Sequence, residues 1–395
     1  MQKKLIAIMT VIVCMFFPGT VFADYSENPV LQSTDDIEIT TTAVSVKSKA
    51  VVLMDGINGN VLYKQNEREK RSPASITKIM TLLLVMEAVE SGRIKLNEVV
   101  SCSDHAASMG GSQIWLEPGE RMTVDDLIKA TAVNSANDAA VALAEFVAGS
   151  EESFVELMNR RAKELSMNDT VFKNACGLDA EGHITSALDI AIMAKELIAH
   201  QLVMDYSKIW TDTLRNGKTE LANTNKLIKT YDGATGLKTG YTETAGYCLA
   251  ATALRGGLPL IAVTLGSDTI DDRNQTAKAL LDYGFANYTV YTPSADSGSL
   301  KNIKVLKGVK NEVSLKAEKP SALVVPKGTE KTIKQKLELP QDLIAPVDKG
   351  QTVGKLRFVS DAKVLCEYKI LAAENIERMA FLPALAMLFK EFFRA

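Results

Sequence analysis

A serine and a lysine stand one helical turn apart at the head of an almost wholly apolar run, and this pair limits the possible folds more than any other feature. Residues 71–87 read RSPASITKIMTLLLVME, with Ser75 and Lys78 as the pair. After Lys78 the run is apolar except for Thr81 up to the end of TLLLVM, so protein is expected on most sides of it. The Lys78 ammonium then either extends to water or loses its proton on burial. In the second case a neutral Lys78 can activate Ser75 as a nucleophile.

Local signals predict a helix over residues 72–91 that carries this pair. Ser72 is expected to act as its N-cap, Pro73 suits the first helical position, and Gly92 is expected to end it. Ser75 then lies in the first turn, with the lysine directly below it.

The first 23 residues are predicted to be a cleaved signal peptide. Two lysines precede thirteen uncharged residues and then the small-residue site Val21-Phe22-Ala23. A retained membrane anchor is the alternative, but the run is shorter than the roughly 17 residues that span a bilayer. Residues 24–45 are polar and are predicted to be a tether. The protein is therefore expected to be exported.

Charge and composition exclude several classes of function. A formal net charge of −3 gives no general attraction to nucleic acid. The cysteines after the signal segment are widely spaced without a CxxC pair, and there are only three histidines. We therefore predict neither a zinc site nor a disulfide framework, and no cofactor. These cysteines are Cys102, Cys176, Cys248 and Cys366.

Secondary-structure signals in residues 46–291 predict a sheet covered by helices. Asn58-Gly59 between two β-rich runs indicates a hairpin, and Gly256-Gly257 indicates a second one within the strands expected over residues 235–266. Strands, then helices, then strands favour an α+β fold with an antiparallel sheet. Helices are predicted at about 72–91, 123–148, 150–165, 186–200 and 272–288.

The pattern of apolar and polar residues changes after about residue 291. Residues 301–371 alternate apolar and lysine-rich polar positions, and four prolines argue against long helices there. A small all-β domain is therefore predicted over residues 292–372. Its lysine-rich faces fit either contact with an anionic surface or an ordinary solvated face.

Residues 373–395 are predicted to form an amphipathic helix. An uncharged stretch from Met379 to Phe389 is too short to span a bilayer, but its large apolar side chains suit a helix lying in the membrane surface. The alternative is a helix docked on its own domain or on a second copy of the chain.

Two further short motifs accompany the Ser-x-x-Lys pair. Ser-x-x-Lys also occurs at Ser360-Lys363, but only the pair at residues 75 and 78 opens an apolar helix. Ser-x-Asn occurs at Ser26, Ser135 and Ser166, and the middle one lies at a break between two helical patterns, where it can project into a cleft. Lys-Thr-Gly occurs once, at residues 238–240.

At these residues the chain resembles the low-molecular-mass penicillin-binding proteins that act as D-alanyl-D-alanine carboxypeptidases. The resemblance implies a β-lactamase or penicillin-binding transpeptidase-like catalytic domain, a small all-β domain and a terminal amphipathic helix that holds the protein on the outer face of the cytoplasmic membrane, in the cell wall compartment. It covers almost the whole chain after the tether, including the segments GSQIWLEPGE, SANDAAVALAE, MNRRAKELSMNDTVFKNACGL and GATGLKTGYTETAGYC.

Acyl transfer from an amide requires a nucleophile, a base and an acid. Ser75 is predicted to attack the carbonyl of the penultimate D-alanine of a peptidoglycan stem peptide. Lys78, kept neutral by desolvation and by the nearby charge of Lys238, is predicted to take its proton. The resemblance implies that Ser135 relays a proton to the departing D-alanine. It also implies that Asn137 orients the lysine and binds the substrate amide, although a simple helix-capping role is the alternative.

The Lys-Thr-Gly motif is expected on an edge strand, where the substrate binds as an added strand. Lys238 and Thr239 are predicted to hold the terminal carboxylate, and Gly240 to let the substrate backbone approach. The N–H groups of Ser75 and Tyr241 would form the oxyanion hole. Tyr241 departs from the histidine that is common at this position in the family.

Arg273 is implied as a further cationic contact for the carboxylate, although pairing with the preceding Asp271 and Asp272 is an alternative. The resemblance also implies covalent inhibition by β-lactam antibiotics.

Two other functions remain as alternatives. A class A β-lactamase shares the fold and has a glutamate that positions water, and Glu164 with Asn168 mimics that spacing. A penicillin sensor or peptidoglycan-binding module with an inactive site is the non-enzymatic alternative. The presence of all the motif residues favours the carboxypeptidase.

Overall fold

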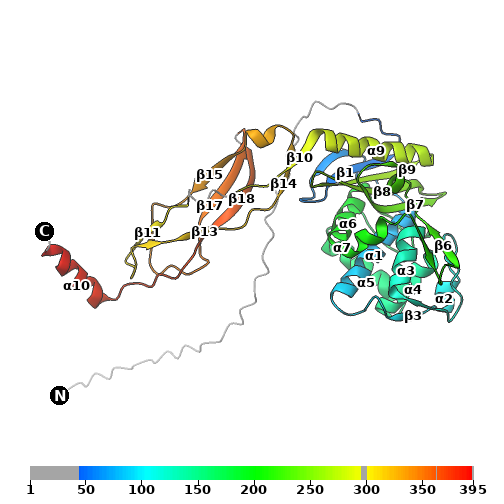
Figure 1. The fold of residues 1–395 in the computed structure, drawn as a ribbon, viewed down its shortest axis with the longest axis horizontal. Coiled ribbons are helices and arrows are strands. Elements are labelled where there is room, and N and C mark those ends of the chain that lie inside the picture. The colour runs from blue at the N-terminus through cyan, green and yellow to red at the C-terminus, as the bar shows by residue number, and fades with distance from the viewer. Residues whose placement is uncertain (1–43, 295–299, 362, 394–395) are drawn as a thin grey trace, which may run out of the picture. The chain divides into compact units, whose positions relative to one another are not determined.

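The structure is a computed structural model that describes residues 44–294, 300–361 and 363–393 (Figure 1). The predicted signal peptide, residues 1–23, and all but the end of the predicted tether lie outside the described residues. The boundaries assigned to the segments from sequence remain predictions.

A five-stranded antiparallel sheet forms the centre of the larger domain, in the order β2-β1-β9-β8-β7. Both predicted hairpins are confirmed, and β7 lies at the edge of the sheet, as the Lys-Thr-Gly motif was expected to. The long strands are apolar at almost every position because helices cover both faces of the sheet. The strands are β1 (Ala50–Asp55), β2 (Val61–Gln65), β7 (Ala234–Thr242), β8 (Gly246–Arg255) and β9 (Leu258–Ser267).

Helices lie on both faces of this sheet (Figure 1). α9 packs on one face, and α6 packs on the other with α1 beside it. Serine or threonine caps begin five of these helices by accepting a first-turn N–H, as the sequence pattern favours. The helices are α1 (Lys78–Glu90), α2 (Asp104–Ala107), α3 (Val124–Lys129), α4 (Asn137–Ala148), α5 (Glu151–Glu164), α6 (Ala187–Ala199), α7 (Gln201–Ser207), α8 (Leu227–Thr230) and α9 (Ile270–Asn287).

The predicted start of the helix over residues 72–91 is wrong. A 3₁₀ turn over Ala74–Thr77 precedes α1, which begins only at Lys78. Ser72 is not a cap, because its hydroxyl donates to Asp179 Oδ1 at 3.1 Å. Ala74 has φ +48°, a left-handed conformation that interrupts a regular helix. The serine nucleophile candidate therefore lies in a tight turn instead of a helical first turn.

The predicted helix over residues 123–148 is divided at the expected break. α3 runs into a π-helical turn over Ala130–Asn134, Ser135 follows with left-handed φ +62°, and α4 then starts at Asn137. Two small hairpins complete this domain. They are β3 (Val99–Ser101) with β4 (Arg121–Thr123), and β5 (Thr211–Leu214) with β6 (Thr219–Ala222).

In its described residues the carboxy-terminal domain consists of β-strands, as predicted, together with a 3₁₀ turn over Thr329–Lys331. Its own hydrophobic cluster includes the fully buried Leu356, Phe358 and Ile370. Its sheets are β12-β11-β16 and β13-β18-β17-β15, and β14 pairs with β10. The strands are β10 (Tyr288–Tyr291), β11 (Ile303–Leu306), β12 (Glu312–Val313), β13 (Leu315–Ala317), β14 (Leu323–Pro326), β15 (Lys334–Glu338), β16 (Asp342–Ile344), β17 (Thr352–Ser360) and β18 (Lys363–Ala372).

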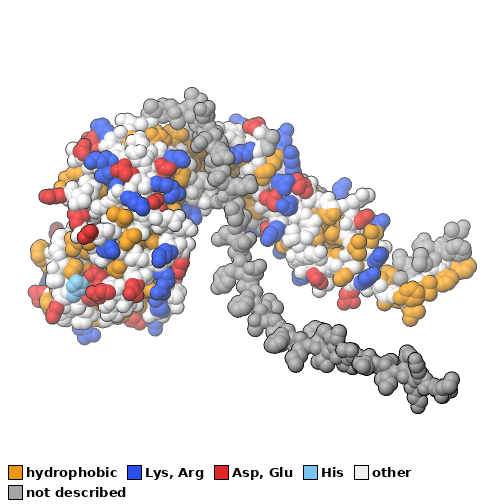
Figure 2. All heavy atoms as spheres, turned by 180° about the vertical axis from the view of Figure 1, so that it is seen from behind, with side chains coloured by type: hydrophobic (Ala, Val, Ile, Leu, Met, Phe, Trp, Pro, Cys, Tyr) orange, Lys and Arg blue, Asp and Glu red, His pale blue; other side chains and the backbone are white. Residues whose placement is uncertain are grey.

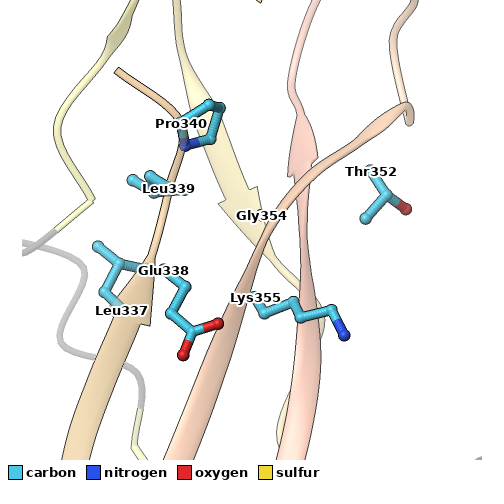
Figure 3. A pocket seen from close by; sticks show the side chains of 7 residues that line it. All are labelled: Leu337, Glu338, Leu339, Pro340, Thr352, Gly354 and Lys355. Atoms are coloured by element: carbon cyan, nitrogen blue, oxygen red, sulfur yellow. The ribbon is translucent and has the colours of Figure 1, made fainter. Parts of the chain in front are cut away.

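A hollow lies at one end of the paired strands β15 and β17 (Figure 3). Glu338 and Lys355 are register partners there, and both side chains line the hollow. Gly354 lets the strands approach closely, because a Cβ at this position would lie 2.5 Å from the Glu338 carbonyl oxygen.

The last helix, α10, spans Phe381–Phe392 and is shorter than the predicted segment 373–395. Ile376, which precedes it, belongs instead to the hydrophobic cluster of the β domain. Several large apolar side chains of α10 are exposed, and they form an apolar strip in Figure 2. Among the described residues, no helix combines the length and apolar character that crossing a membrane requires.

Candidate active site

A tight turn presents Ser75 against the edge strand of the main sheet. Gly177 packs on this turn so closely that a Cβ there would lie 1.9 Å from the Ala74 carbonyl oxygen. Gly240, on β7, is also confined, although less severely, because its Cβ would lie 3.1 Å from the Ser75 amide nitrogen. Glycine at both positions therefore lets three chain segments meet at the serine.

Lys78 is fully buried below this serine, so the alternative that it extends to water is wrong. Its Nζ donates to Ser75 Oγ at 3.0 Å, to Asn137 Oδ1 at 2.5 Å and to the Cys176 carbonyl at 2.7 Å. The lysine is thus held by the nucleophile turn, by α4 and by the segment before Gly177.

Burial lowers the pKa of the Lys78 ammonium from 10.5 to about 8, and the neighbouring Cys176 and Asp138 oppose part of this shift. At pH 7 a group with this pKa is uncharged in about one molecule in ten, against about one in three thousand for an ordinary lysine. The sequence interpretation attributed the neutral lysine to burial and to the charge of Lys238 together. Burial lowers the pKa of Lys78, and Lys238 is not among the groups that shift it.

Ser135 and Lys238 form a second buried pair. The left-handed conformation of Ser135 directs its side chain to Lys238, whose Nζ donates to Ser135 Oγ at 2.7 Å and to the Thr239 carbonyl at 3.0 Å. Burial lowers the pKa of Lys238 well below its usual value, and the charges of Lys78 and Arg273 lower it further. A charge on Lys78 therefore disfavours protonation of Lys238.

Arg273 is buried and contributes positive potential to this cluster. The alternative that it pairs with its neighbours is wrong, because Asp272 binds Lys47 and Asp271 accepts from Gln275. Its own Nε donates to Asn274 Oδ1 at 3.2 Å.

The Lys-Thr-Gly motif lines the edge strand as predicted. The Thr239 hydroxyl, on β7, donates to Thr224 Oγ1 at 2.7 Å. Tyr241 is 53% exposed and stacks on Tyr247 with ring centroids 4.4 Å apart, so its ring lies outside the buried cluster.

Asn137 does not cap α4, since its side chain donates to the Gly110 carbonyl at 2.6 Å and accepts from Lys78. The adjacent Asp138 is also buried, and it accepts the backbone N–H groups of Ile114 and Leu116 at 3.1 and 3.0 Å. The side chains of Asn137 and Asp138 thus hold the loop that follows α2 against the site.

Sequence reasoning missed several groups that contact the site, because no motif or pattern marks them. The Cys176 carbonyl is a backbone group, and Thr224 lies in no motif. His183 Nε2 lies 2.9 Å from Thr77 Oγ1, which itself donates to the Ala74 carbonyl, so the histidine must be the donor. Burial lowers the pKa of His183 to about 4, so it is neutral and supports the turn before Ser75.

Two competing motif matches within the described residues do not form sites, and the match at Ser26 lies outside them. Ser360, at the end of β17, is buried and shares a hydrogen bond with Thr332 at 2.6 Å, whereas its strand partner Lys363, the first residue of β18, is exposed. The Glu164 side chain is 54% exposed and pairs with Arg161. It therefore lacks the buried position that a glutamate activating water for a β-lactamase requires.

The fold and this cluster define a class of serine enzymes in which a buried lysine serves the nucleophile. A family model described as D-alanyl-D-alanine carboxypeptidase matches residues 37–269, and one described as penicillin-binding protein 5, C-terminal domain, matches residues 288–378. The chain belongs to the D-alanyl-D-alanine carboxypeptidase family.

Named relatives and solved structures agree with this assignment. D-alanyl-D-alanine carboxypeptidase DacF of Bacillus subtilis is 43% identical, over 87% of this chain and 90% of its own length. Penicillin binding protein 5 from Haemophilus influenzae has a TM-score of 0.77 at 30% identity, covering 86% of this chain and 100% of that chain. Penicillin-binding protein D2 from Listeria monocytogenes, solved with cefotaxime bound, has a TM-score of 0.58 at 32% identity, covering 62% and 100%.

Replacing Gly177 by alanine is expected to slow acylation by penicillin about a hundredfold, because the new Cβ must push the Ala74 carbonyl and with it Ser75 out of position. Gly182→Ala is the matched control. Gly182 also has a positive φ, +75°, but the nearest atom to its Cβ is the flexible Lys173 Cε at 3.3 Å. Equal losses in both variants, measured with a fluorescent penicillin, would show that backbone strain and not crowding at the serine is responsible.

Proposed function

We propose that this protein removes the terminal D-alanine from peptidoglycan stem peptides through an acyl-enzyme on Ser75. The observation that carries the proposal is the contact of Ser75 Oγ with the buried Lys78 Nζ at 3.0 Å. The enzyme is a serine hydrolase of the family just described, and β-lactams are expected to acylate the same serine.

Lys78 acts as the general base in this proposal. A neutral amine has two N–H donors and one lone pair. Two carbonyl oxygens, of Asn137 and of Cys176, lie in place to accept the two N–H groups. The lone pair is then left for the third neighbour, the Ser75 hydroxyl, so the proton moves from Ser75 Oγ to Lys78 Nζ as Oγ attacks.

Ser135 and Lys238 serve the departing D-alanine. The Ser135 hydroxyl accepts from Lys238 Nζ, which leaves its own proton free to pass to the leaving nitrogen. Arg273 supplies positive potential that attracts a terminal carboxylate. Lys238 and Thr239 bind that carboxylate in this proposal, Thr239 by turning its hydroxyl proton away from Thr224 Oγ1. Asn137 holds the base in place and offers its amide to the substrate.

The oxyanion is proposed to bind between the N–H groups of Ser75 and Tyr241. The close approach of Gly240 to the Ser75 nitrogen supports this position, because it brings the next residue of β7 beside the nucleophile turn. Since β7 is an edge strand, the substrate can add to it as a further strand.

We also propose that the enzyme works outside the cytoplasmic membrane and is held there by α10. The signal pattern in residues 1–23 supports export, and the exposed apolar side chains of α10 support insertion into a membrane surface. Phe381, Leu382 and Phe389 are 77, 75 and 56% exposed.

Ser75→Ala is expected to abolish both covalent labelling by penicillin and release of D-alanine from a pentapeptide, because no other hydroxyl lies against Lys78 Nζ among its described hydrogen-bond partners. Stable labelling of the unmodified enzyme separates it from a β-lactamase, which would turn the drug over, and from a non-catalytic binder, which would remain unlabelled. Labelling or D-alanine release that survives in the variant would exclude Ser75 as the nucleophile.

The rate of acylation is expected to rise with pH and level off above about pH 8. The neutral form of Lys78 is the active one, and it is lost as the pH falls below the lysine pKa of about 8. The second-order rate constant should therefore fall about tenfold for each pH unit well below 8. A stopped-flow series with a neutral acyl donor measures it, and a rate that stays flat from pH 6 to about 9 would contradict a lysine base with this pKa.

The triple variant Phe381→Asp, Leu382→Asp and Phe389→Asp is expected to lower binding to phospholipid vesicles by at least about a hundredfold, since three large apolar side chains no longer enter the bilayer surface. D-alanine release from a soluble peptide should be unchanged. Ile344→Asp, at an apolar position in the β domain that is 64% exposed, is the control. Unaltered vesicle flotation of the triple variant would mean that α10 does not anchor the protein.

A further inference from the structure

The loop between α2 and β4 holds an exposed tryptophan that the proposed reaction does not use. Trp115, in the segment GSQIWLEPGE, is 75% exposed. An exposed apolar side chain is ordinary by itself. What sets Trp115 apart is that its backbone is fixed on both sides and that the same loop contacts the active site.

Two buried or half-buried side chains fix this backbone. The Asp138 carboxylate accepts the N–H groups of Ile114 and Leu116, the residues on either side of Trp115. Arg215 donates to the carbonyls of Ile114 at 2.8 Å and of Trp115 at 3.3 Å. Trp115 itself has φ +59°, so the indole projects from a constrained turn. A side chain presented in this way loses little conformational entropy when it binds a ligand.

The loop is continuous with the catalytic cluster. Asn137, which binds Lys78, donates its side-chain amide to the Gly110 carbonyl and its backbone N–H to the Ser112 carbonyl at 2.7 Å. Trp115 follows Gly110 by five residues, so it lies within about 17 Å of it along the chain. The substrate of the proposed reaction is a peptide of several residues attached to a glycan. An extended peptide of about five residues also spans about 17 Å, so its glycan end can reach this loop.

A hollow beside Trp115 has the chemistry of a sugar site. The residues that line it include Trp115, Ser108, Gln113 and Glu117. The backbone carbonyl of Gln113 accepts from Asn134, but its side-chain amide has no hydrogen-bond partner among the described residues. A pyranose ring offers apolar C–H faces that pack on an aromatic plane and hydroxyl groups that bind amide and carboxylate groups.

We propose that Trp115, with Gln113 and Glu117, forms a subsite for an amino-sugar ring of the glycan strand that carries the stem peptide. The inference rests on the proposed function, because the glycan reaches this loop only when its peptide lies in the active site. The subsite favours glycan-linked substrate over the free peptide and takes no part in bond breaking.

The first test compares two substrates, a pentapeptide still attached to its disaccharide and the same pentapeptide without sugar. Trp115→Ala is expected to lower kcat/KM for the glycan-linked substrate by about fivefold to tenfold and to leave the free peptide within about twofold. Trp115→Phe should retain most of the preference. Leu254→Ala, at an apolar position that is 49% exposed in the hairpin between β8 and β9, should change neither substrate. Equal losses on both substrates, or no loss on either, would overturn the subsite.

A second test is independent of catalysis. The chain has two tryptophans, so in a Trp210→Phe background the tryptophan fluorescence, excited where tyrosine does not absorb, comes from Trp115 alone. Titration with chitotriose, a peptide-free oligomer of N-acetylglucosamine, is expected to give a saturable change that Gln113→Ala with Glu117→Ala weakens. No change at millimolar sugar would overturn the subsite even if the enzyme releases D-alanine. A fluorescence response in a protein that releases no D-alanine would instead overturn the proposed function and keep the sugar site.

Discussion

The removal of the Lys78 ammonium from water is the interaction on which the rest of the site depends. A pKa lowered from 10.5 to about 8 corresponds to about 3 kcal/mol of preference for the uncharged amine. Three separate parts of the chain meet around this group, namely the turn before α1, the start of α4 and the segment ending at Cys176. Each provides an oxygen, and the apolar interior around α1 provides the desolvation.

Backbone conformation then brings the nucleophile to the lysine. Ala74 and Ser135 both have a left-handed backbone conformation, which is uncommon for residues other than glycine. Ala74 precedes the nucleophile Ser75, and Ser135 carries the second hydroxyl of the catalytic cluster. Gly177 and Gly240 remove the side chains that would keep their segments away from Ser75. The second lysine, Lys238, extends the cluster along β7 to the open edge of the sheet, where a substrate strand can bind.

The sequence predicted the parts of this arrangement that depend on residue type. Ser75 and Lys78 were recognisable because a hydroxyl and an amine are rare at the head of an apolar run. Ser135 and Lys238 were recognisable from two short motifs, and the Lys-Thr-Gly motif lies on the edge strand β7 as expected. The predicted N-cap role of Ser72 was wrong because its hydroxyl donates a hydrogen bond to Asp179, which is distant in sequence. The oxygen of Cys176 could not be predicted, since every residue has a backbone carbonyl and only the tertiary structure selects one.

The most direct test of this account is a titration of Lys78 by NMR, with lysine labelled with carbon-13 at Cε and the signal assigned by its loss in Lys78→Arg. The account predicts that the Cε signal of Lys78 changes with a midpoint near pH 8, about two pH units below an exposed lysine. A midpoint at or above about pH 10 would mean that the amine keeps its proton throughout the working range. That result would contradict its role as the base for Ser75.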